Sequence, residues 1–232
     1  MEITELFLEK YKELESVISL VYGEEFDGAA VSWLERKKEF RDINSELKCC
    51  REIRNLLQHN VKISGEYAVV PNRSMIDFID GLIVRIENPT TCGDIAVPFE
   101  KVFYKEPSDN VKETMCQMRK LKYTHVPILV SGKVAGVFSE HTAFKFFLEK
   151  YEDKIDKNTT FKDIFELISL KNGTEEVFKF AAINTRLSEI EDMFEDGIKK
   201  NEKIRMIFLT KTGDSDDKLL GIVSHWDIIG KQ

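Results

Sequence analysis

The sequence predicts an α+β fold, in which an N-terminal helical bundle precedes two β-α-β-β-α repeats related by a pseudo-twofold axis. Three observations predict it. Before Pro89, apolar residues recur at the three- and four-residue steps of amphipathic helices. After Pro89, short β-rich runs alternate with short helical segments. Two motifs in this second part each occur twice, and such repetition indicates two related structural units.

Composition is that of a soluble globular protein. Of the 232 residues 42% are hydrophobic and 32% charged, which excludes disordered, collagen-like and disulfide-scaffold classes. The formal net charge of −7 argues against a protein that coats duplex nucleic acid. The acidic, amphipathic N-terminus is unlike a signal peptide, and no apolar run reaches the roughly 18 residues of a membrane span. We therefore expect a cytoplasmic protein without a membrane partner.

Four helices are expected in a first domain of residues 1–88. The first is ended by Gly23, the fourth is capped by Ser74, and Asn88-Pro89 stops the chain from continuing as a helix. The first carries an apolar stripe of Leu6, Leu8, Tyr11, Leu14, Val17, Ile18 and Val21. The expected ranges are, in order, about 6–21, 29–38, 42–61 and 74–88.

Residues 89–232 form the second domain, with repeats over about 89–152 and 153–232. Each is expected to hold a hairpin followed by a helix. The paired runs are 126–130 with 134–138, and 205–210 with 219–223.

Two motifs establish the repeat. Thr91 to Ile95 matches Thr160 to Ile164, and Gly136 to Ser139 matches Gly221 to Ser224. One copy of about 60 residues would bury too little apolar surface by itself. We therefore expect the two copies to pack sheet to sheet around a shared core, with two related clefts between them.

The segment 219–229 carries a glycine, two hydrophobic residues, a serine, two variable residues and an aspartate, an order typical of CBS domains. Residues from about Thr90 to Gln232 thus resemble a tandem CBS-domain pair, or Bateman module. The first copy has the same pattern over 134–142, except that Thr142 stands where the family prefers aspartate. His125 to Ile128 is similar to the family's strand entry.

A nucleotide site is expected at Ser224 and Asp227. The Ser224 hydroxyl can meet a phosphate near the N-terminus of the last helix, and the Asp227 carboxylate can accept both hydroxyls of a ribose. An alternative is that both residues only cap that helix. The resemblance implies that the site is completed, with adenine among the apolar groups, by Thr91, Ile95, Ala96, Thr124, His125 and Ile222.

The resemblance also implies a second cleft. There Arg205 is expected to contact phosphates. Because the hydroxyl of Thr142 cannot accept two ribose hydroxyls as a carboxylate does, we expect weaker nucleoside binding in this cleft. Its expected residues are Ser139, Thr142, Thr160, Ile164, Ile204 and Arg205.

In the third helix, Arg54, Asn55 and His59 have the spacing of the HEPN superfamily, which the first domain resembles. That resemblance implies a metal-independent ribonuclease, with His59 as general acid or base and Arg54 and Asn55 holding a phosphate. An alternative is structural: Arg54 pairs with an acid on a neighbouring helix, and His59 stabilises the end of its own helix.

Three functions follow from these patterns. The first is a regulatory sensor that binds an adenine nucleotide in the CBS-pair cleft and relays its binding to a helical dimerisation domain. The second is a HEPN-type ribonuclease acting on RNA and gated by nucleotide. The third is a dimerisation module that binds no ligand. The candidate ligands are AMP, ADP, ATP and S-adenosylmethionine; no cofactor or metal is expected to be required, and a homodimer is expected.

Overall fold

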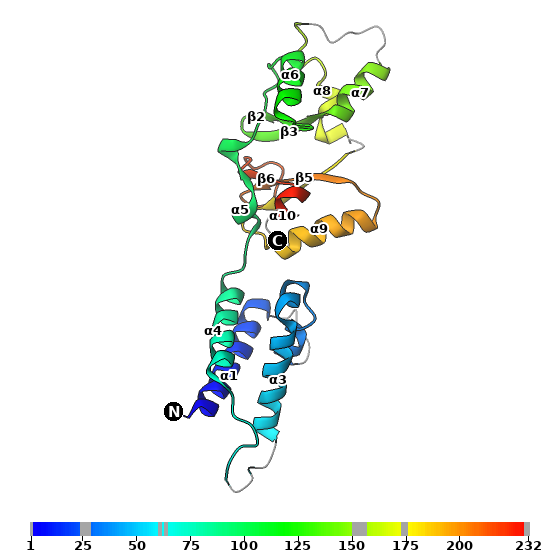
Figure 1. Ribbon diagram of the computed structural model, residues 1–232. Helices are drawn as coiled ribbons and strands as arrows, with labels where there is room; N and C mark the ends of the chain where they lie inside the picture. The colour runs from blue at the N-terminus through cyan, green and yellow to red at the C-terminus, as the bar shows by residue number, and fades with distance from the viewer. Residues whose placement is uncertain are drawn as a thin grey trace. The chain divides into compact units, whose positions relative to one another are not determined.

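The chain divides into two compact units, residues 1–89 and 90–232 (Figure 1). The computed structural model describes residues 2–23, 29–59, 62, 65–149, 157–172 and 176–229. Among these residues, no helix combines the length and apolar character needed to cross a bilayer.

Unit 1 is helical. The expected helix over 29–38 is shorter than predicted, because it ends at Leu34 and a 3-10 helix follows. The cap of the last helix also differs, since the Asn72 side chain, not Ser74, accepts a hydrogen bond of 3.0 Å from the Met75 N–H. The elements are α1 (Ile3–Tyr22), α2 (Ala30–Leu34), η2 (Lys38–Ile43), α3 (Asn44–His59) and α4 (Arg73–Glu87).

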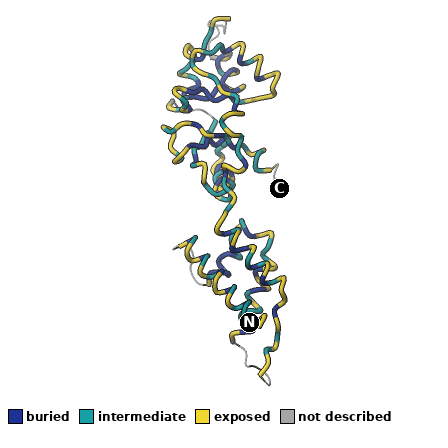
Figure 2. The backbone as a smooth tube through the Cα atoms, turned by 90° about the vertical axis from the view of Figure 1, so that its left-hand side faces the viewer, coloured by how far each residue is buried: buried dark blue, intermediate teal, exposed yellow. Residues whose placement is uncertain are grey.

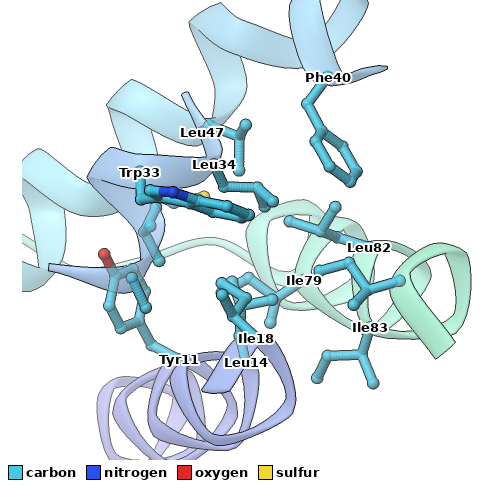
Figure 3. Close-up of a cluster of buried hydrophobic side chains, with 14 of the residues drawn as sticks. Tyr11, Leu14, Ile18, Trp33, Leu34, Phe40, Leu47, Ile79, Leu82 and Ile83 are labelled. Atoms are coloured by element: carbon cyan, nitrogen blue, oxygen red, sulfur yellow. The ribbon is translucent and has the colours of Figure 1, made fainter. Parts of the chain in front are cut away.

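The core of unit 1 lies between these helices. Figure 3 shows side chains from α1, α2, α3 and α4 pointing into one common space. Tyr11, Leu14 and Ile18 of the predicted stripe are buried there, whereas Leu6 and Leu8 are only partly buried. The stripe therefore marks the face that α1 packs inward.

Unit 2 contains both expected hairpins, β2 with β3 and β5 with β6, each followed by a helix. The first copy comprises α5 (Cys92–Ile95), β1 (Val97–Pro98), η3 (Phe99–Lys101), α6 (Val111–Leu121), β2 (His125–Val130), β3 (Lys133–Ser139) and α7 (Glu140–Glu149). The second comprises α8 (Phe165–Ile168), η4 (Leu170–Asn172), β4 (Val177–Ala182), α9 (Leu187–Lys199), β5 (Ile204–Thr210), β6 (Gly221–Val223) and α10 (His225–Ile229).

Each of the two sheets is built around the hairpin of one copy. One runs β1-β6-β5-β4, with β4 parallel to β5 and the other pairs antiparallel. The other is the β2-β3 hairpin, which single bridges extend on both sides: Lys105 beside Ile128, and Ser169 beside Gly136. Consequently the opening segment of each copy pairs with the hairpin of the other copy.

The cores show the same exchange. Phe161, Ile164 and Ile168 of the second copy are buried among residues of the first. Cys92 and Ile95 of the first copy are buried among residues of the second. Between the sheets lies a shared core, and Figure 2 shows buried residues in the interior of unit 2. This core includes Val102, Leu129, Val134, Val137, Met206, Phe208 and Leu219.

The Thr-x-x-Asp motif caps a turn in both copies. The Thr91 N–H and hydroxyl each donate to Asp94 over 2.8 Å. The Thr160 N–H and hydroxyl donate to Asp163 over 2.8 and 2.7 Å. These bonds from Thr160 hold the pKa of Asp163 below its ordinary value. The repeat seen in the sequence is thus a repeated backbone turn.

A glycine substitution tests the exchange of segments. A Cβ at Gly136 would lie 2.6 Å from the Ile168 carbonyl oxygen, whereas a Cβ at Gly81 in α4 would meet nothing within 4 Å. We expect Gly136→Ala to destabilise the fold by about 1–3 kcal/mol, the usual cost of overpacking. Gly81→Ala is the control and should stabilise by about 0.5–1 kcal/mol. Urea unfolding measures both, and an unaffected Gly136→Ala variant would contradict the close approach.

Candidate functional site

A cleft of about 660 Å³ lies within unit 2, and both copies line it. Thr124 and His125 reach it from the entry to β2, Ile222 from β6, and Ser224 and Asp227 from the start of α10. These five were expected to share a site, and the structure brings them together.

The other three residues expected at this site do not line the cleft. Thr91 caps α5 through Asp94. Ile95 is buried in the core of the second copy, and Ala96 packs against the same core. Their segment leads into β1, which pairs with β6, and Val97 of β1 lines the cleft beside its partner Ile222.

Asp227 caps the helix that carries it. Its Oδ2 atom accepts the Ser224 N–H over 2.7 Å and the Ser224 hydroxyl over 2.6 Å. These are the contacts that the capping alternative expects, and they leave open a second role for the carboxylate. A carboxylate has about four acceptor positions on two oxygens. Within the described part of the chain no donor meets Oδ1, so this atom can accept a ligand hydroxyl while Oδ2 holds the turn.

Cations line the cleft of an otherwise acidic chain. Lys101, Lys122 and Arg205 contribute to the wall, and Asp227 is the one carboxylate among the lining residues that the structure describes. The net charge of the whole chain is −7, so this local excess sets the cleft apart. A cleft of this sign raises the local concentration of anions.

The residues expected in a second cleft are divided among several places. Ile204 and Arg205 line the Asp227 cleft instead. Thr160 caps a turn, and Ile164 is buried in the core of the first copy. Ser139 and Thr142 do lie together, with their hydroxyl oxygens 3.0 Å apart, but Ser139 is fully buried.

Glu176, which the sequence analysis did not single out, meets this buried pair. Its Oε2 atom accepts the Ser139 hydroxyl over 2.5 Å. Its Oε1 atom lies 2.9 Å from His125 Nε2 and 3.4 Å from Arg205 Nε. The Glu176 side chain is only 10% exposed. Glu176 belongs to no motif of the sequence, so only the fold reveals its partners.

The surroundings of Glu176 act on its pKa in opposite directions. Burial raises it, whereas the hydrogen bonds from His125 and Ser139 and the charge of Arg205 lower it. The lowering prevails, and the pKa of Glu176 lies below its ordinary value of 4.5. The carboxylate is therefore ionised near neutral pH.

This shift predicts a pH dependence of stability. A depressed folded-state pKa contributes stability that is present above the ordinary pKa and lost as the pH falls through the folded value. We expect the free energy of unfolding of the wild type to exceed that of Glu176→Gln, and the difference to shrink below pH 4.5. Urea titrations measure it, with exposed Glu113→Gln as the charge-matched control. A difference that stays constant in acid would contradict the prediction.

In unit 1, Arg54 is held by its neighbours. Its Nη2 atom lies 3.4 Å from Glu15 Oε1 on α1, and its Nη1 atom donates to Asn55 over 3.2 Å. The guanidinium lies 5.4 Å from the centre of the Tyr11 ring. Arg54 Nε is buried and meets no acceptor among the described residues. Arg54 and Asn55 are thus together, as expected, and the His59 side chain lies outside the described residues.

Arg54 is expected to stabilise unit 1. Arg54→Ala removes the contact with the Tyr11 ring and the pairing with Glu15, and should cost about 1–2 kcal/mol. Arg73 on the same unit is the control, since it is 67% exposed and pairs only along its own helix with Asp77. Arg73→Ala should change stability by less than about 0.5 kcal/mol. Equal effects of both changes on urea unfolding would contradict this structural role.

Comparisons with known proteins follow this geometry. Residues 92–149 match the sequence model of the CBS domain. No curated protein matches the chain.

Among solved structures, AcuB from Vibrio cholerae is 16% identical, with a TM-score of 0.47 over 62% of this chain and 90% of that one. CBSX2 in complex with AMP is 19% identical, with a TM-score of 0.44 over 61% and 94%. A hemolysin-like protein containing a CBS domain, from Oenococcus oeni PSU, is 10% identical, with a TM-score of 0.43 over 62% and 90%. The segment of this chain that carries a CBS-domain match is therefore 92–149, which holds the Thr124 and His125 wall of the cleft.

Proposed function

We propose that residues 90–232 form a CBS-domain pair and that the cleft at Asp227 binds an adenine nucleotide. One observation carries the proposal: a single cleft combines a carboxylate at a helix start, three cationic side chains and an apolar wall. Its volume of about 660 Å³ lies within the usual range of about 300–1,000 Å³ for small-molecule sites.

Each part of a nucleotide has a matching group in this proposal. The ribose hydroxyls donate to Asp227, whose Oδ1 atom is not used by the cap. The phosphate meets Arg205 and Lys101, and charge-assisted bonds of this kind are strong. The base lies against apolar side chains such as Ile222 and Val97. The AMP bound by CBSX2 supports an adenine ligand.

The proposed role is regulatory. A ligand can shift a protein between two arrangements only when it binds them with different affinity. Both copies supply walls of the cleft, at His125 and at Asp227, so a bound nucleotide contacts both and favours one arrangement of the pair. We propose that this change is relayed to unit 1, which serves dimerisation.

Unit 1 has no catalytic role in this proposal. The HEPN-type ribonuclease would need Arg54 to hold an RNA phosphate. The ion pair with Glu15 and the buried Nε atom support a structural role for Arg54 instead.

Ligand-dependent thermal unfolding tests the proposal. A ligand at about 100 times its dissociation constant adds about 2.7 kcal/mol of stability. We expect one of AMP, ADP, ATP or S-adenosylmethionine to raise the unfolding midpoint of the wild type, and Asp227→Ala to lose that shift. The control is Asp217→Ala. Asp217 accepts the N–H and the hydroxyl of Thr212, as Asp227 does those of Ser224, but it lies outside the cleft.

The control separates loss of the site from loss of a cap. Asp217→Ala should keep the full ligand-dependent shift. If no nucleotide shifts the wild type, the sensor proposal fails. If Asp227→Ala and Asp217→Ala respond to the nucleotide alike, the ligand binds elsewhere.

A further inference from the structure

Three side chains from different parts of unit 2 converge on the carboxylate of Glu176. Ser139 lies at the end of β3, His125 begins β2 and Arg205 lies in β5. Each contacts a Glu176 oxygen at 2.5, 2.9 and 3.4 Å, respectively. Ser139 is fully buried, and Glu176 is nearly so. A buried carboxylate is costly unless cations and hydrogen bonds compensate it, as they do here.

Groups of these kinds also bind phosphate in proteins. Ser139 precedes the ten-residue helix α7, whose N-terminus favours a negative charge. The Thr142 N–H donates to Ser139 Oγ over 3.1 Å, which fixes the hydroxyl at the first turn. Arg205 supplies a positive charge, and the His125 ring lies 2.9 Å from the Glu176 carboxylate. Ser139 matches Ser224 in the repeat, so Glu176 lies at the position that corresponds to the proposed nucleotide site, where the second cleft was expected.

We propose that Glu176 is a built-in anion that occupies the second cleft and excludes a phosphate group from it. The chain then binds ligand phosphate only on the Asp227 side. This inference rests on the proposed function in one respect, since it treats the two clefts as related sites. Glu176 also lines a cavity of about 790 Å³, so a small anion has a route to its position once the carboxylate is removed.

Two substitutions separate the effect of the Glu176 charge from the effect of the volume that its side chain fills. Glu176→Ala removes the carboxylate and opens its position, whereas Glu176→Gln removes the charge and keeps the position filled. Isothermal titration with pyrophosphate counts the sites. We expect Glu176→Ala to bind one pyrophosphate more than the wild type, and Glu176→Gln to gain none. The control is Glu113→Ala on α6, which removes one negative charge at an exposed position and should match the wild type.

A second titration with AMP distinguishes a free phosphate from a nucleotide as the occupant of the opened site. An added AMP site in Glu176→Ala identifies a nucleotide; an added pyrophosphate site alone identifies the phosphate group. Either supports the inference. Glu176→Ala with no added site for either ligand overturns it, as does an equal gain in Glu176→Gln or Glu113→Ala.

The titrations distinguish failure of the inference about Glu176 from failure of the nucleotide proposal. A wild type that binds no nucleotide refutes the sensor, while an added pyrophosphate site in Glu176→Ala still supports the inference. If the wild type binds nucleotide but Glu176→Ala gains no site, the sensor proposal stands and the inference about Glu176 fails. If Glu176→Ala does not fold alone, we expect pyrophosphate in the refolding buffer to restore folding, and failure of that rescue overturns the inference.

Discussion

The exchange of opening segments between the two copies is the constraint on which unit 2 depends. Cys92 and Ile95 complete the core of the second copy, and Phe161 and Ile164 complete that of the first. The free energy of burying these side chains is gained only when both copies are present, because each closes the other's core. The walls of the cleft therefore come from both copies.

The repeat gives unit 2 two matching strand-to-helix junctions, at Ser139 and at Ser224, and their side chains differ. At Ser224, Asp227 holds the turn with Oδ2, in a cleft that Lys101, Lys122 and Arg205 also line. At the other, Thr142 stands in the matching position, and Glu176 brings a carboxylate from a different segment. His125 and Arg205 line the Asp227 cleft and also contact Glu176, so the charge of Glu176 acts on that cleft.

Local patterns in the sequence predicted local structure. Both hairpins and the repeated Thr91 and Thr160 motifs were predictable, because turn chemistry and alternation are encoded within a few residues. The prediction of Ser74 as a cap was wrong, since Asn72 two residues earlier offers an equally good acceptor.

Long-range placement was harder to predict. Ile95 was expected beside a ligand, but an apolar side chain on a segment that crosses to the other copy is more stable inside a core. Arg205 was assigned to the second cleft, but it lines the Asp227 cleft and also contacts Glu176. Glu176 belongs to no motif, and its role depends on three residues far away in the sequence.

The central claim is that one nucleotide contacts both copies across the Asp227 cleft. Backbone amide spectra of the isotopically labelled protein, recorded as AMP is added, test it most directly. The account predicts that the amide resonances of His125 and of Ser224 shift together with a single dissociation constant. Shifts confined to one copy, or shifts only in unit 1, would contradict it.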